Sequence, residues 1–585
     1  MATEKAVKTV TITLDGQEVS GPPGTTILEL SLEAGVHIPT LCYHSSLPSS
    51  GACRLCLVEE EKTKALLASC VTPIAPGMVI NTKSPRVLER RKTIVELMLS
   101  SHPDSCLVCD KGNRCQLRQV ASEMGIGCIT LQRIPQLAIT DDVNPFIERD
   151  LAKCILCGKC IRACQELVVE GAIDYFQRGF VTRPATLGNQ PLEKSECTFC
   201  GTCVALCPTG AITEREKSYR SSTANAVQTT CPFCGCGCGI TLEVRDNRLV
   251  RAVPTDQSRP LCVRGSYGTD FIHSPERLTQ PLVKKEGKFA AVSWDEALTT
   301  VAEKLSQIKQ QHGGDSLAVL GSSRCTNEES YLLQRFARSL LGTSNIDNGA
   351  RMYGAAIHFA PAYLSLTGPA SNLDTLEQSD VIMVIGADPS SSAPAAGYVI
   401  KRAARNKKAR LVLVDPRETK LAMFAHQWLR PEASSDVALL NGLMKVIMDE
   451  GLIDKESVSQ RAANLQSLTK GLESYTPEHV ERLTGISPQS LRETARLLAG
   501  AQKAAIVFGS GITQQANGTD GVAALVNLAI ITGKARLYAL ERDSNARGAS
   551  DMGVLPDFLP GYTPVEDAAA RARFEECWGV KLSDK

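Results

Sequence analysis

The cysteines between residues 154 and 207 constrain this chain more than any other feature of its sequence. They form the run C-x2-C-x2-C-x3-C twice, and Pro208 follows the second run. The eight cysteines are Cys154, Cys157, Cys160, Cys164, Cys197, Cys200, Cys203 and Cys207. Thiolates at this spacing hold 4Fe-4S clusters, and in paired runs the fourth cysteine of each run binds the cluster of the other. The pattern therefore predicts two neighbouring 4Fe-4S clusters.

The crossed arrangement gives each cluster three cysteines from one run and one from the other. The first predicted cluster, here called cube A, uses Cys154, Cys157, Cys160 and Cys207. The second, cube B, uses Cys197, Cys200, Cys203 and Cys164. A pair of zinc knuckles is the alternative, because zinc sites also use C-x2-C pairs, but they seldom repeat this tight tetrad with a trailing proline. Two clusters this close predict a relay for single electrons.

Length and charge exclude several functional classes. A chain of 585 residues is too long for one core and predicts roughly three to five domains. Its net charge of +1 leaves no basic footprint for nucleic acid and no polybasic membrane patch. We find no apolar run long enough to span a bilayer and no leader peptide, so we expect a cytoplasmic protein that reaches the inner face of a membrane through partners at most. In a reducing compartment its 23 cysteines are expected to bind metal rather than form disulfides.

Residues 1–84 predict a β-grasp domain with a 2Fe-2S cluster. A strand over 7–14, a turn at Asp15-Gly16, a second strand and a helix over 26–34 with Thr25 as N-cap precede four cysteines. These are Cys42, Cys53, Cys56 and Cys70. The strings over 38–44 and 51–59 resemble the N-terminal domain of the large iron-sulfur subunit of respiratory complex I (NADH:quinone oxidoreductase) and of its hydrogenase and formate dehydrogenase relatives. The four cysteines fill the frame, so His37 and His44 are expected to be structural rather than Rieske-type ligands.

Residues 85–148 predict a helix over 85–100 followed by a second cluster segment. Its potential ligands are His102, Cys106, Cys109 and Cys115. The string from 102 to 115 resembles the 4Fe-4S site of the same complex I subunit, which has one histidine and three cysteines. Exchanging a thiolate for a neutral imidazole makes a cluster less negative and changes its potential. Cys128 has no partner motif and is expected to be a buried thiol. The domain of cubes A and B follows over 149–216.

A polar linker over 215–228 leads to a fifth cysteine motif within a predicted domain over 227–283. Its members are Cys231, Cys234, Cys238 and Cys262, with strands expected over 240–243 and 248–253. The string over 231–239 resembles the 4Fe-4S motif that opens molybdopterin formate dehydrogenases, where Cys236 falls at a non-ligand position. Molybdenum-bearing members commonly have a lysine two residues after the last ligand. This chain has Arg264 there, so the resemblance implies an altered route to a pterin.

The strings over 274–282 and 292–298 resemble the formate dehydrogenase large subunit, and the resemblance continues for nearly three hundred residues. Residues 284–585 predict a truncated α/β domain. Buried strands are expected over 380–388 and 409–415, with a helix near 397–406. In the family, loops like those at Gly386, Asp415 and Arg417 contact the guanosine end of a pterin cofactor at strand carboxyl ends. Since a turn after a buried strand is weak evidence alone, a plain Rossmann-like scaffold is the alternative, and we interpret the loops as vestigial.

The family's reaction centre is expected to be missing. Its metal-ligating cysteine or selenocysteine is replaced by Tyr353 and the following histidine by Gly354, while His358 is displaced by several residues. Ala393 and Gln515 also stand where relatives commonly have histidine. The chain stops where such formate dehydrogenases continue into a further domain, so we expect a truncated α/β domain with no catalytic residues of its own and no bound molybdopterin.

The sequence thus predicts a multidomain α+β and α/β protein that carries one 2Fe-2S and four 4Fe-4S clusters. Its predicted role is single-electron transfer within an NAD(P)H-linked, complex I-like oxidoreductase. An FMN- and NADH-binding flavoprotein would supply electrons, and another subunit (a quinone, hydrogenase, ferredoxin or reductase module) would accept them. A molybdenum- or tungsten-dependent formate dehydrogenase subunit completed by a separate chain is the alternative, and a zinc-stapled scaffold is a third. The terminal acceptor is expected to be determined by partner chains, and the cluster potentials by the hydrogen bonds and burial around each cube.

Overall fold

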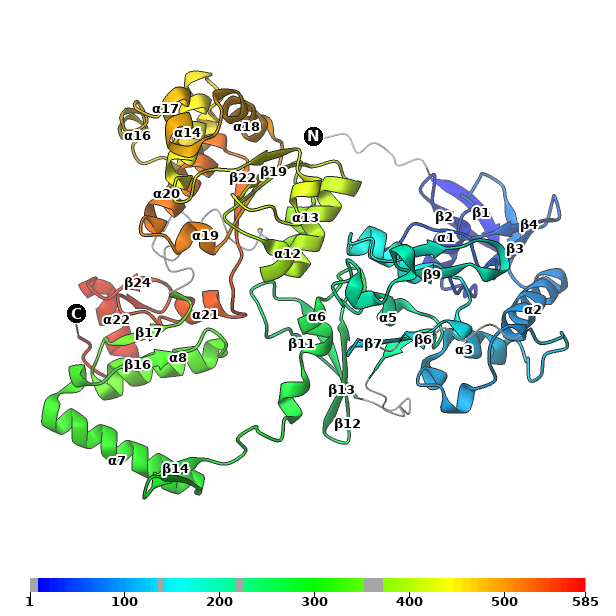
Figure 1. Ribbon diagram of the computed structural model, residues 1–585, viewed down its shortest axis with the longest axis horizontal. Coiled ribbons are helices and arrows are strands. Elements are labelled where there is room, and N and C mark those ends of the chain that lie inside the picture. The colour runs from blue at the N-terminus through cyan, green and yellow to red at the C-terminus, as the bar shows by residue number, and fades with distance from the viewer. Residues whose placement is uncertain (1–8, 135–139, 142–143, 216–224, 352–371, 584–585) are drawn as a thin grey trace. The chain divides into compact units, whose positions relative to one another are not determined.

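The computed structural model describes residues 9–134, 140–141, 144–215, 225–351 and 372–583 (Figure 1). Contacts divide the chain into two compact units. The first comprises residues 1–229 and 240–269, and the second comprises residues 230–239 and 270–585. In the described part of the chain, no helix is both long and apolar enough to cross a bilayer.

A five-stranded sheet of order β2-β1-β5-β3-β4 opens the first unit. Its strands are β1 (Val10–Leu14), β2 (Gln17–Gly21), β3 (Leu57–Glu60), β4 (Ala65–Ala68) and β5 (Val79–Asn81). The predicted turn at Asp15-Gly16 is confirmed, since both residues have positive φ angles, of 48° and 85°. β1 pairs in parallel with β5 and antiparallel with β2.

Helix α1 (Ile27–Glu33) packs against this sheet, with Ile27 and Leu30 in one core with Ile12. Its N-cap is Thr26, so the expectation of Thr25 was wrong by one residue. The Thr26 hydroxyl accepts a hydrogen bond from the Glu29 amide, and the Glu29 carboxylate accepts one from the Thr26 amide. This reciprocal capping box satisfies two amides that a cap at Thr25 would leave open.

Two helices lie between this sheet and the cysteine runs in the sequence. α2 (Pro85–Ser100) confirms the predicted helix over 85–100. Its N-cap is Ser84. After the short turns η1 (Cys106–Val108) and η2 (Gly112–Arg114), α3 (Gln116–Glu123) packs Leu117 and Val120 against Val95 of α2. Cys42 and Cys53 belong to the same core, so the first cysteine frame lies against these helices.

The two cysteine runs fold as one turn used twice. Leu156 and Phe199 have φ angles of 54° and 51°, and Gly158 and Gly201 follow with 68° and 75°. Glycine adopts this left-handed backbone without the strain of a Cβ. Each turn leads directly into a short helix. The surrounding elements are β6 (Thr140–Asp141), β7 (Ile147–Asp150), η3 (Leu151–Lys153), α4 (Lys159–Arg162), η4 (Ala163–Leu167), β8 (Asp174–Phe176), η5 (Gly179–Val181), β9 (Arg183–Ala185), η6 (Leu187–Asn189), η7 (Leu192–Lys194), α5 (Thr202–Leu206) and β10 (Ile212–Glu214).

A three-stranded sheet of order β11-β12-β13 ends the first unit. Its strands are β11 (Asn225–Thr230), β12 (Gly239–Arg245) and β13 (Arg248–Pro254), and α6 (Val263–Tyr267) follows. β12 and β13 confirm the strands expected over 240–243 and 248–253. The prediction of a linker over 215–228 was wrong from residue 225 onwards, because strand β11 begins there and pairs with β12.

The second unit is built on a five-stranded parallel sheet of order β20-β19-β18-β21-β22. Its strands are β18 (Val381–Ile385), β19 (Arg410–Val414), β20 (Gln427–Leu429), β21 (Ala504–Phe508) and β22 (Ala535–Ala539). β18 and β19 confirm the strands expected over 380–388 and 409–415. Helix α13 (Pro394–Asn406) confirms the helix near 397–406 and begins three residues earlier than expected.

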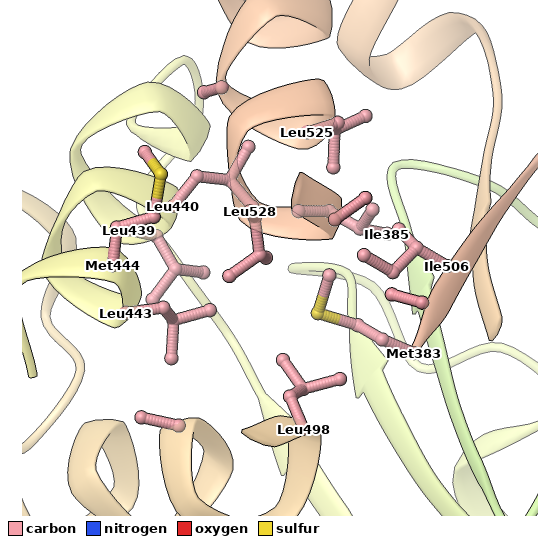
Figure 2. Close-up of a cluster of buried hydrophobic side chains, with 14 of the residues drawn as sticks. Met383, Ile385, Leu439, Leu440, Leu443, Met444, Leu498, Ile506, Leu525 and Leu528 are labelled. Atoms are coloured by element: carbon pink, nitrogen blue, oxygen red, sulfur yellow. The ribbon is translucent and has the colours of Figure 1, made fainter. Parts of the chain in front are cut away.

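Helices cover both faces of this sheet. Met383 and Ile385 face a core with Leu443 and Leu528, to which α14, α18 and α20 contribute (Figure 2). Ile382 and Val384 alternate to the other face, where α13 packs. The covering helices are α11 (Leu373–Glu377), α12 (Pro389–Ser392), η12 (Ala422–Phe424), α14 (Asp436–Asp449), α15 (Lys455–Arg461), α16 (Leu465–Gly471), α17 (Pro477–Thr484), α18 (Pro488–Gly500), α19 (Ser510–Thr513) and α20 (Gly518–Thr532).

The rest of the second unit consists of segments from both ends of its sequence. Arg338 joins them, because its guanidinium donates to the carbonyl oxygens of Leu555, Pro556 and Phe558. The elements are η8 (Asp270–His273), β14 (Leu282–Lys285), β15 (Lys288–Ala291), α7 (Trp294–His312), η9 (Gly314–Ser316), β16 (Val319–Gly321), α8 (Asn327–Arg335), η10 (Phe336–Leu341), β17 (Ile346–Asn348), α21 (Ala546–Asp551), β23 (Phe558–Leu559), β24 (Thr563–Pro564) and α22 (Ala568–Trp578).

Candidate functional site

The four cysteines predicted for the 2Fe-2S cluster come together in the N-terminal domain. Cys42, Cys53, Cys56 and Cys70 are all buried, and the Cys53 amide approaches the Cys42 sulfur at 3.5 Å. Hydrogen bonds from Cys53 lower the pKa of Cys42 to about 5. Hydrogen bonds from Cys70 lower the pKa of Cys56 to about 6. The same contacts raise the pKa of Cys53 and Cys70, so they favour one thiolate in each cysteine pair.

His102 has the hydrogen bonding of a metal-binding imidazole. Its Nδ1 lies 3.1 Å from the Pro103 carbonyl oxygen, which fixes the proton on Nδ1. Its Nε2 is buried and has no hydrogen-bond partner among the residues that the structure describes. Burial also lowers the pKa of His102, which favours the neutral ring. The free Nε2 lone pair is therefore available to a metal.

Cys106, Cys109 and Cys115 are the thiols predicted to share this cluster. Cys106 is exposed, and the other two are half-buried. Burial raises the pKa of Cys115, and the nearby charges of Cys109 and Cys106 raise it further. The three thiols are thus close enough to interact electrostatically.

Cubes A and B each correspond to a cavity in the first unit. One cavity is lined by Cys154, Cys157, Cys160 and Cys207, together with Gly158 and Pro208. The other is lined by Cys164, Cys197, Cys200 and Cys203, together with Gly201 and Val168. Each cavity therefore contains three cysteines of one run and the fourth cysteine of the other. These are the two predicted ligand sets.

The walls of both cavities are apolar enough to disfavour free thiolates. Burial raises the pKa of Cys154 to about 11 and that of Cys157 to about 12 around the first cavity. Around the second it raises the pKa of Cys197 to about 11 and that of Cys200 to about 12. Thiolates in such surroundings need a cation to offset their desolvation, and iron would supply it.

Across the described ranges, no group of three His, Cys, Asp or Glu side chains is packed tightly enough to hold a single metal ion. The ligands of one zinc ion all lie about 2.0–2.3 Å from the same centre. In a 4Fe-4S cluster each thiolate binds a different iron, so the four ligands stand further apart than around a single ion. The cavities lined by four cysteines suit the second arrangement.

Cube A adjoins the 2Fe-2S frame through α4. Arg162 donates from Nη1 to the Pro48 carbonyl oxygen at 2.5 Å and from Nη2 to the Cys42 carbonyl oxygen at 2.5 Å. Its Nη2 also lies 3.4 Å from the carbonyl oxygen of Cys157, a cube A residue. Lys159 is buried beside it and donates to Gln116 Oε1 at 3.2 Å. Two basic side chains therefore occupy the junction between these frames.

Cube A also adjoins the segment with His102. A Cβ added at Gly210 would lie 2.6 Å from the Cys109 sulfur, so only glycine permits this approach. The Gln116 amide donates to the Pro208 carbonyl oxygen at 2.9 Å. Buried Lys111 donates from Nζ to the Val204 carbonyl oxygen at 3.2 Å. This second junction also holds a buried basic side chain.

The four residues of the predicted fifth cluster are divided between the units. In the first unit, Cys262 is the N-cap of α6. Ser266 of this helix donates to the carbonyl oxygen of Cys200, a cube B residue, at 2.8 Å. In the second unit, the Cys231 amide donates to the Cys238 carbonyl oxygen and closes the cysteine loop. Arg264, expected to replace a family lysine, lies in the first turn of α6.

Other histidines and cysteines singled out in the sequence have different surroundings. His44 receives a hydrogen bond at Nδ1 from the Ser46 amide, and its Nε2 lies 2.9 Å from Gln257 Oε1. His37 lies 3.8 Å from a Glu123 carboxylate oxygen. Cys128 is exposed, so the expectation of a buried thiol was wrong. It lies on the loop that follows α3, outside the core that this helix forms.

A cavity of about 740 Å³ lies at the carboxyl ends of strands β18, β19, β21 and β22 in the second unit. Gly386, Asp415 and Arg417, the predicted nucleotide-loop residues, all line it. Arg417 donates to both carboxylate oxygens of Asp415, at 3.1 Å each. Ligands of open parallel sheets bind at this edge.

This cavity fits the nucleotide end of a pterin cofactor. Asp388 Oδ1 is buried and, within the described residues, has no hydrogen-bond partner. Gly386 has a φ of 57°, and a Cβ there would approach the Gly511 and Ile512 backbone to 3.0 Å. Glycine thus permits this loop to pack closely against the segment that follows β21. Tyr353, Gly354 and His358, the positions of the predicted lost reaction centre, lie outside the described residues.

The sequence motifs did not reveal the basic residues at the junctions. Lys111, Lys159 and Arg162 lie within or next to cysteine runs, where a solvated position is the ordinary expectation. A signal was present, since two bases follow within a few residues of Gly158, on a helix that must pack against a cluster. Lys159 nevertheless finds Gln116 only through folding, because 43 residues separate them.

Family models match the chain along most of its length. They are a 2Fe-2S iron-sulfur cluster binding domain (7–85), the NADH-ubiquinone oxidoreductase-G iron-sulfur binding region (91–129), a 4Fe-4S dicluster domain (153–211), the molybdopterin oxidoreductase Fe4S4 domain (224–274) and molybdopterin oxidoreductase (277–573). Iron-sulfur domains thus precede a molybdopterin oxidoreductase domain. The expected truncation of that domain stays a prediction.

Similar proteins are oxidoreductases. The NADPH-Fe(3+) oxidoreductase subunit alpha of Geobacter sulfurreducens is 35% identical over 98% of this chain and 68% of its own length. A putative formate dehydrogenase of Staphylococcus aureus is 31% identical over 98% of this chain and 63% of its own. The crystal structure of an NAD+-reducing [NiFe]-hydrogenase matches 36% of this chain and 90% of its own with 29% identity and a TM-score of 0.35. The chain therefore belongs to the molybdopterin oxidoreductase family and carries NADH-ubiquinone oxidoreductase-G-like iron-sulfur domains ahead of the family domain.

Proposed function

We propose that this chain is the iron-sulfur electron-transfer subunit of a multisubunit, NAD(P)H-linked oxidoreductase of the complex I type. The observation that carries the proposal is the pair of cavities, each lined by four cysteines in the crossed arrangement. When bound, the clusters would accept and release single electrons. One 2Fe-2S cluster and four 4Fe-4S clusters are proposed, with the ligands predicted from the sequence.

The chain's own residues hold the cluster frames next to one another. Arg162 joins the carbonyl oxygens of Cys42 and Cys157, which belong to two different frames. Gly210 lets Cys109 approach the loop that follows Cys207. Ser266 ties the helix after Cys262 to Cys200. These contacts support a relay in which cube A borders the 2Fe-2S and His102 frames and cube B borders the helix of the fifth frame.

The residues around the cubes exclude water, and basic side chains nearby offset negative charge. Leu151 and Ile212 line both cavities and are buried. A dry, preorganised surrounding lowers the reorganisation that accompanies a change of charge. The basic side chains Lys111, Lys159 and Arg162 lie at the junctions and would offset negative charge on adjoining clusters.

A partner flavoprotein is proposed to convert hydride into single electrons, because we find no flavin or nicotinamide fingerprint in the sequence. The name of the Geobacter relative, an alpha subunit of an NADPH-Fe(3+) oxidoreductase, supports an assembly fed by a nicotinamide cofactor. A further subunit would accept the electrons.

Iron and acid-labile sulfide analysis of anaerobically purified protein tests this proposal. Five filled frames predict about 18 iron atoms per chain. Electron paramagnetic resonance (EPR) of the reduced protein should show one 2Fe-2S signal and several 4Fe-4S signals. Stoichiometric zinc without iron would instead support the scaffold alternative. A Cys154→Ala variant that still couples the flavoprotein to the acceptor at the full rate would contradict the relay.

A molybdenum- or tungsten-dependent formate dehydrogenase subunit is the second candidate, and the cavity at the sheet edge favours it. Asp388, Asp415 and Arg417 are the residues proposed to hold the nucleotide end of the pterin. The pterin would supply the ligands of the metal at which formate is oxidised. Metal analysis decides between the candidates, because the electron-relay proposal predicts no molybdenum or tungsten, whereas the formate dehydrogenase predicts one metal atom per chain.

A further inference from the structure

Tyr267 places a hydroxyl group against the cube B turn. The residue ends helix α6 and stacks its ring on Phe146, with centroids 5.1 Å apart and an interplanar angle of 23°. Phe146 in turn packs on Phe199, the residue between Cys197 and Cys200. A small cavity beside the ring is lined by Cys200, Gly201 and Tyr267 itself. The aromatic stack thus fixes the direction of the phenol.

The Tyr267 hydroxyl group lies directly beside the turn of cube B. Tyr267 Oη is buried and lacks a hydrogen-bond partner among the residues that the structure covers. A Cβ built on Gly201 would lie 3.0 Å from this oxygen, so the hydroxyl directly covers the glycine of the turn. A buried, unpaired phenol O–H is costly, and native structures seldom contain one without a reason. The surroundings therefore call for an acceptor at this point.

The neighbouring groups identify the kind of acceptor. Cys200 lines the cavity beside the Tyr267 ring, and Tyr267 and Cys203 pack against the same hydrophobic core. A protonated phenol facing a set of thiolates is a hydrogen-bond donor to sulfur.

We propose that the Tyr267 hydroxyl donates a hydrogen bond to a sulfur atom of cube B and thereby sets the reduction potential of that cluster. This inference rests on the proposed electron-transfer function. A donor stabilises the more negative, reduced state, so it raises the potential. In the step concerned, cube B gains one electron from a neighbouring cluster that loses one, and the Tyr267 proton stays on its oxygen.

The same turn in cube A offers a matched control. Tyr175 Oη lies over Gly158, the counterpart of Gly201. Tyr175 is 50% exposed, however, whereas the Tyr267 hydroxyl is buried. Water can replace this hydroxyl when it is removed. The Tyr175→Phe variant should therefore change the cube A potential little.

Redox titration of Tyr267→Phe and Tyr175→Phe, followed by EPR in the full assembly, tests the proposal. We expect wild-type iron content in both variants, because the rings and their packing are kept. In Tyr267→Phe, the midpoint potential of one 4Fe-4S cluster should become more negative. Electron-nuclear double resonance spectra in H2O and D2O identify couplings to exchangeable protons, and one such coupling seen in the wild type should be missing in this variant. The corresponding shift in Tyr175→Phe should be smaller.

Unchanged 4Fe-4S midpoints and proton couplings in Tyr267→Phe would overturn the hydrogen bond, as would an equal or larger shift in Tyr175→Phe. If wild-type protein shows no 4Fe-4S signal at all, the electron-transfer function itself fails, and the inference fails with it. Iron content and the wild-type spectrum thus separate the two kinds of failure.

Discussion

The guanidinium of Arg162 lies 2.5 Å from the carbonyl oxygen of Cys42, a residue 120 positions earlier in the chain. The same side chain reaches the Cys157 carbonyl oxygen, so it spans the 2Fe-2S and cube A frames. An arginine is always charged and presents several donors in a fixed fork, which lysine does not. Arg162 therefore both holds the junction and keeps a positive charge in it.

Replacing Arg162 by Gln should make reduction of the adjoining clusters less favourable by on the order of 1–3 kcal/mol, because a nearby unit charge is lost in a medium of intermediate dielectric. Redox titration followed by EPR measures this shift. Arg183→Gln is the matched control, since Arg183 lies over the Phe176 ring and donates to Gln177. Equal shifts in the two variants would contradict the role of Arg162.

The Gly210→Ala variant should lose the cluster predicted at His102. Its Cβ would lie 2.6 Å from the Cys109 sulfur and 3.3 Å from Lys153 Cδ, so the thiol must move. We expect about four fewer iron atoms per chain, with cubes A and B retained. Gly127→Ala is the control, because a Cβ there meets no atom of the described residues within 4 Å. Full iron content in Gly210→Ala would show that the loop relaxes freely.

The pH dependence of the second unit should reflect Glu377. Burial raises the pKa of this carboxyl, but the hydrogen bond and charge of Arg402, with the charge of Lys407, outweigh it and hold the pKa below its usual value. A carboxyl whose pKa is lower in the folded than in the unfolded state stabilises the fold at pH values above its unfolded-state pKa. This stabilisation is lost as the pH falls through the folded-state pKa. Glu377 therefore stabilises the unit at neutral pH and ceases to do so in acid.

The Glu377→Gln variant should lower the free energy of unfolding at pH 7 by about 2 kcal/mol, less than for a fully buried pair because Glu377 is partly exposed. The difference from wild type should shrink below about pH 4.5, where the unfolded carboxyl takes up its proton. Tryptophan fluorescence during urea unfolding measures this unit alone, since Trp294, Trp428 and Trp578 all lie within it. A pH-independent difference would contradict the assignment.

The core of the second unit should depend strongly on Leu443. This side chain is fully buried between α14 and the sheet, in the cluster that Figure 2 shows. Leu443→Ala should lower the free energy of unfolding by about 3 kcal/mol, from lost transfer energy and the cavity left behind. Leu483→Ala, at a position 43% exposed, should cost less than about 1 kcal/mol. Urea unfolding of both variants measures the two losses of unfolding free energy and so tests whether Leu443→Ala is the more destabilising.

The sequence was sufficient to predict features that depend on local spacing. The turn at Asp15-Gly16, the helix over 85–100 and the strand over 381–385 follow from short-range patterns, and the structure confirms each. The crossed cysteine sets are a prediction from the spacing of the two runs, and the two cavities lined by four cysteines each support it.

Features that depend on long-range packing could not be predicted. β11 occupies a stretch that reads as a polar linker, because its stability comes from pairing with β12 rather than from its own side chains. Arg162 and Tyr267 have unremarkable local sequences. Arg162 donates to a carbonyl oxygen 120 residues away, and Tyr267 lies over Gly201, which is 66 residues away. Only the fold brings these groups to a cluster frame.

The repeated turns at Gly158 and Gly201 have different covers. Tyr175 lies over the first and belongs to the stretch between the two cysteine runs, whereas Tyr267 lies over the second and belongs to a helix well beyond them. The duplicated motif is therefore symmetric in its ligands and asymmetric in its surroundings. Substitutions at Tyr175 or Tyr267 leave every cysteine in place, so the two proposed clusters can differ in electron affinity through positions that do not bind iron.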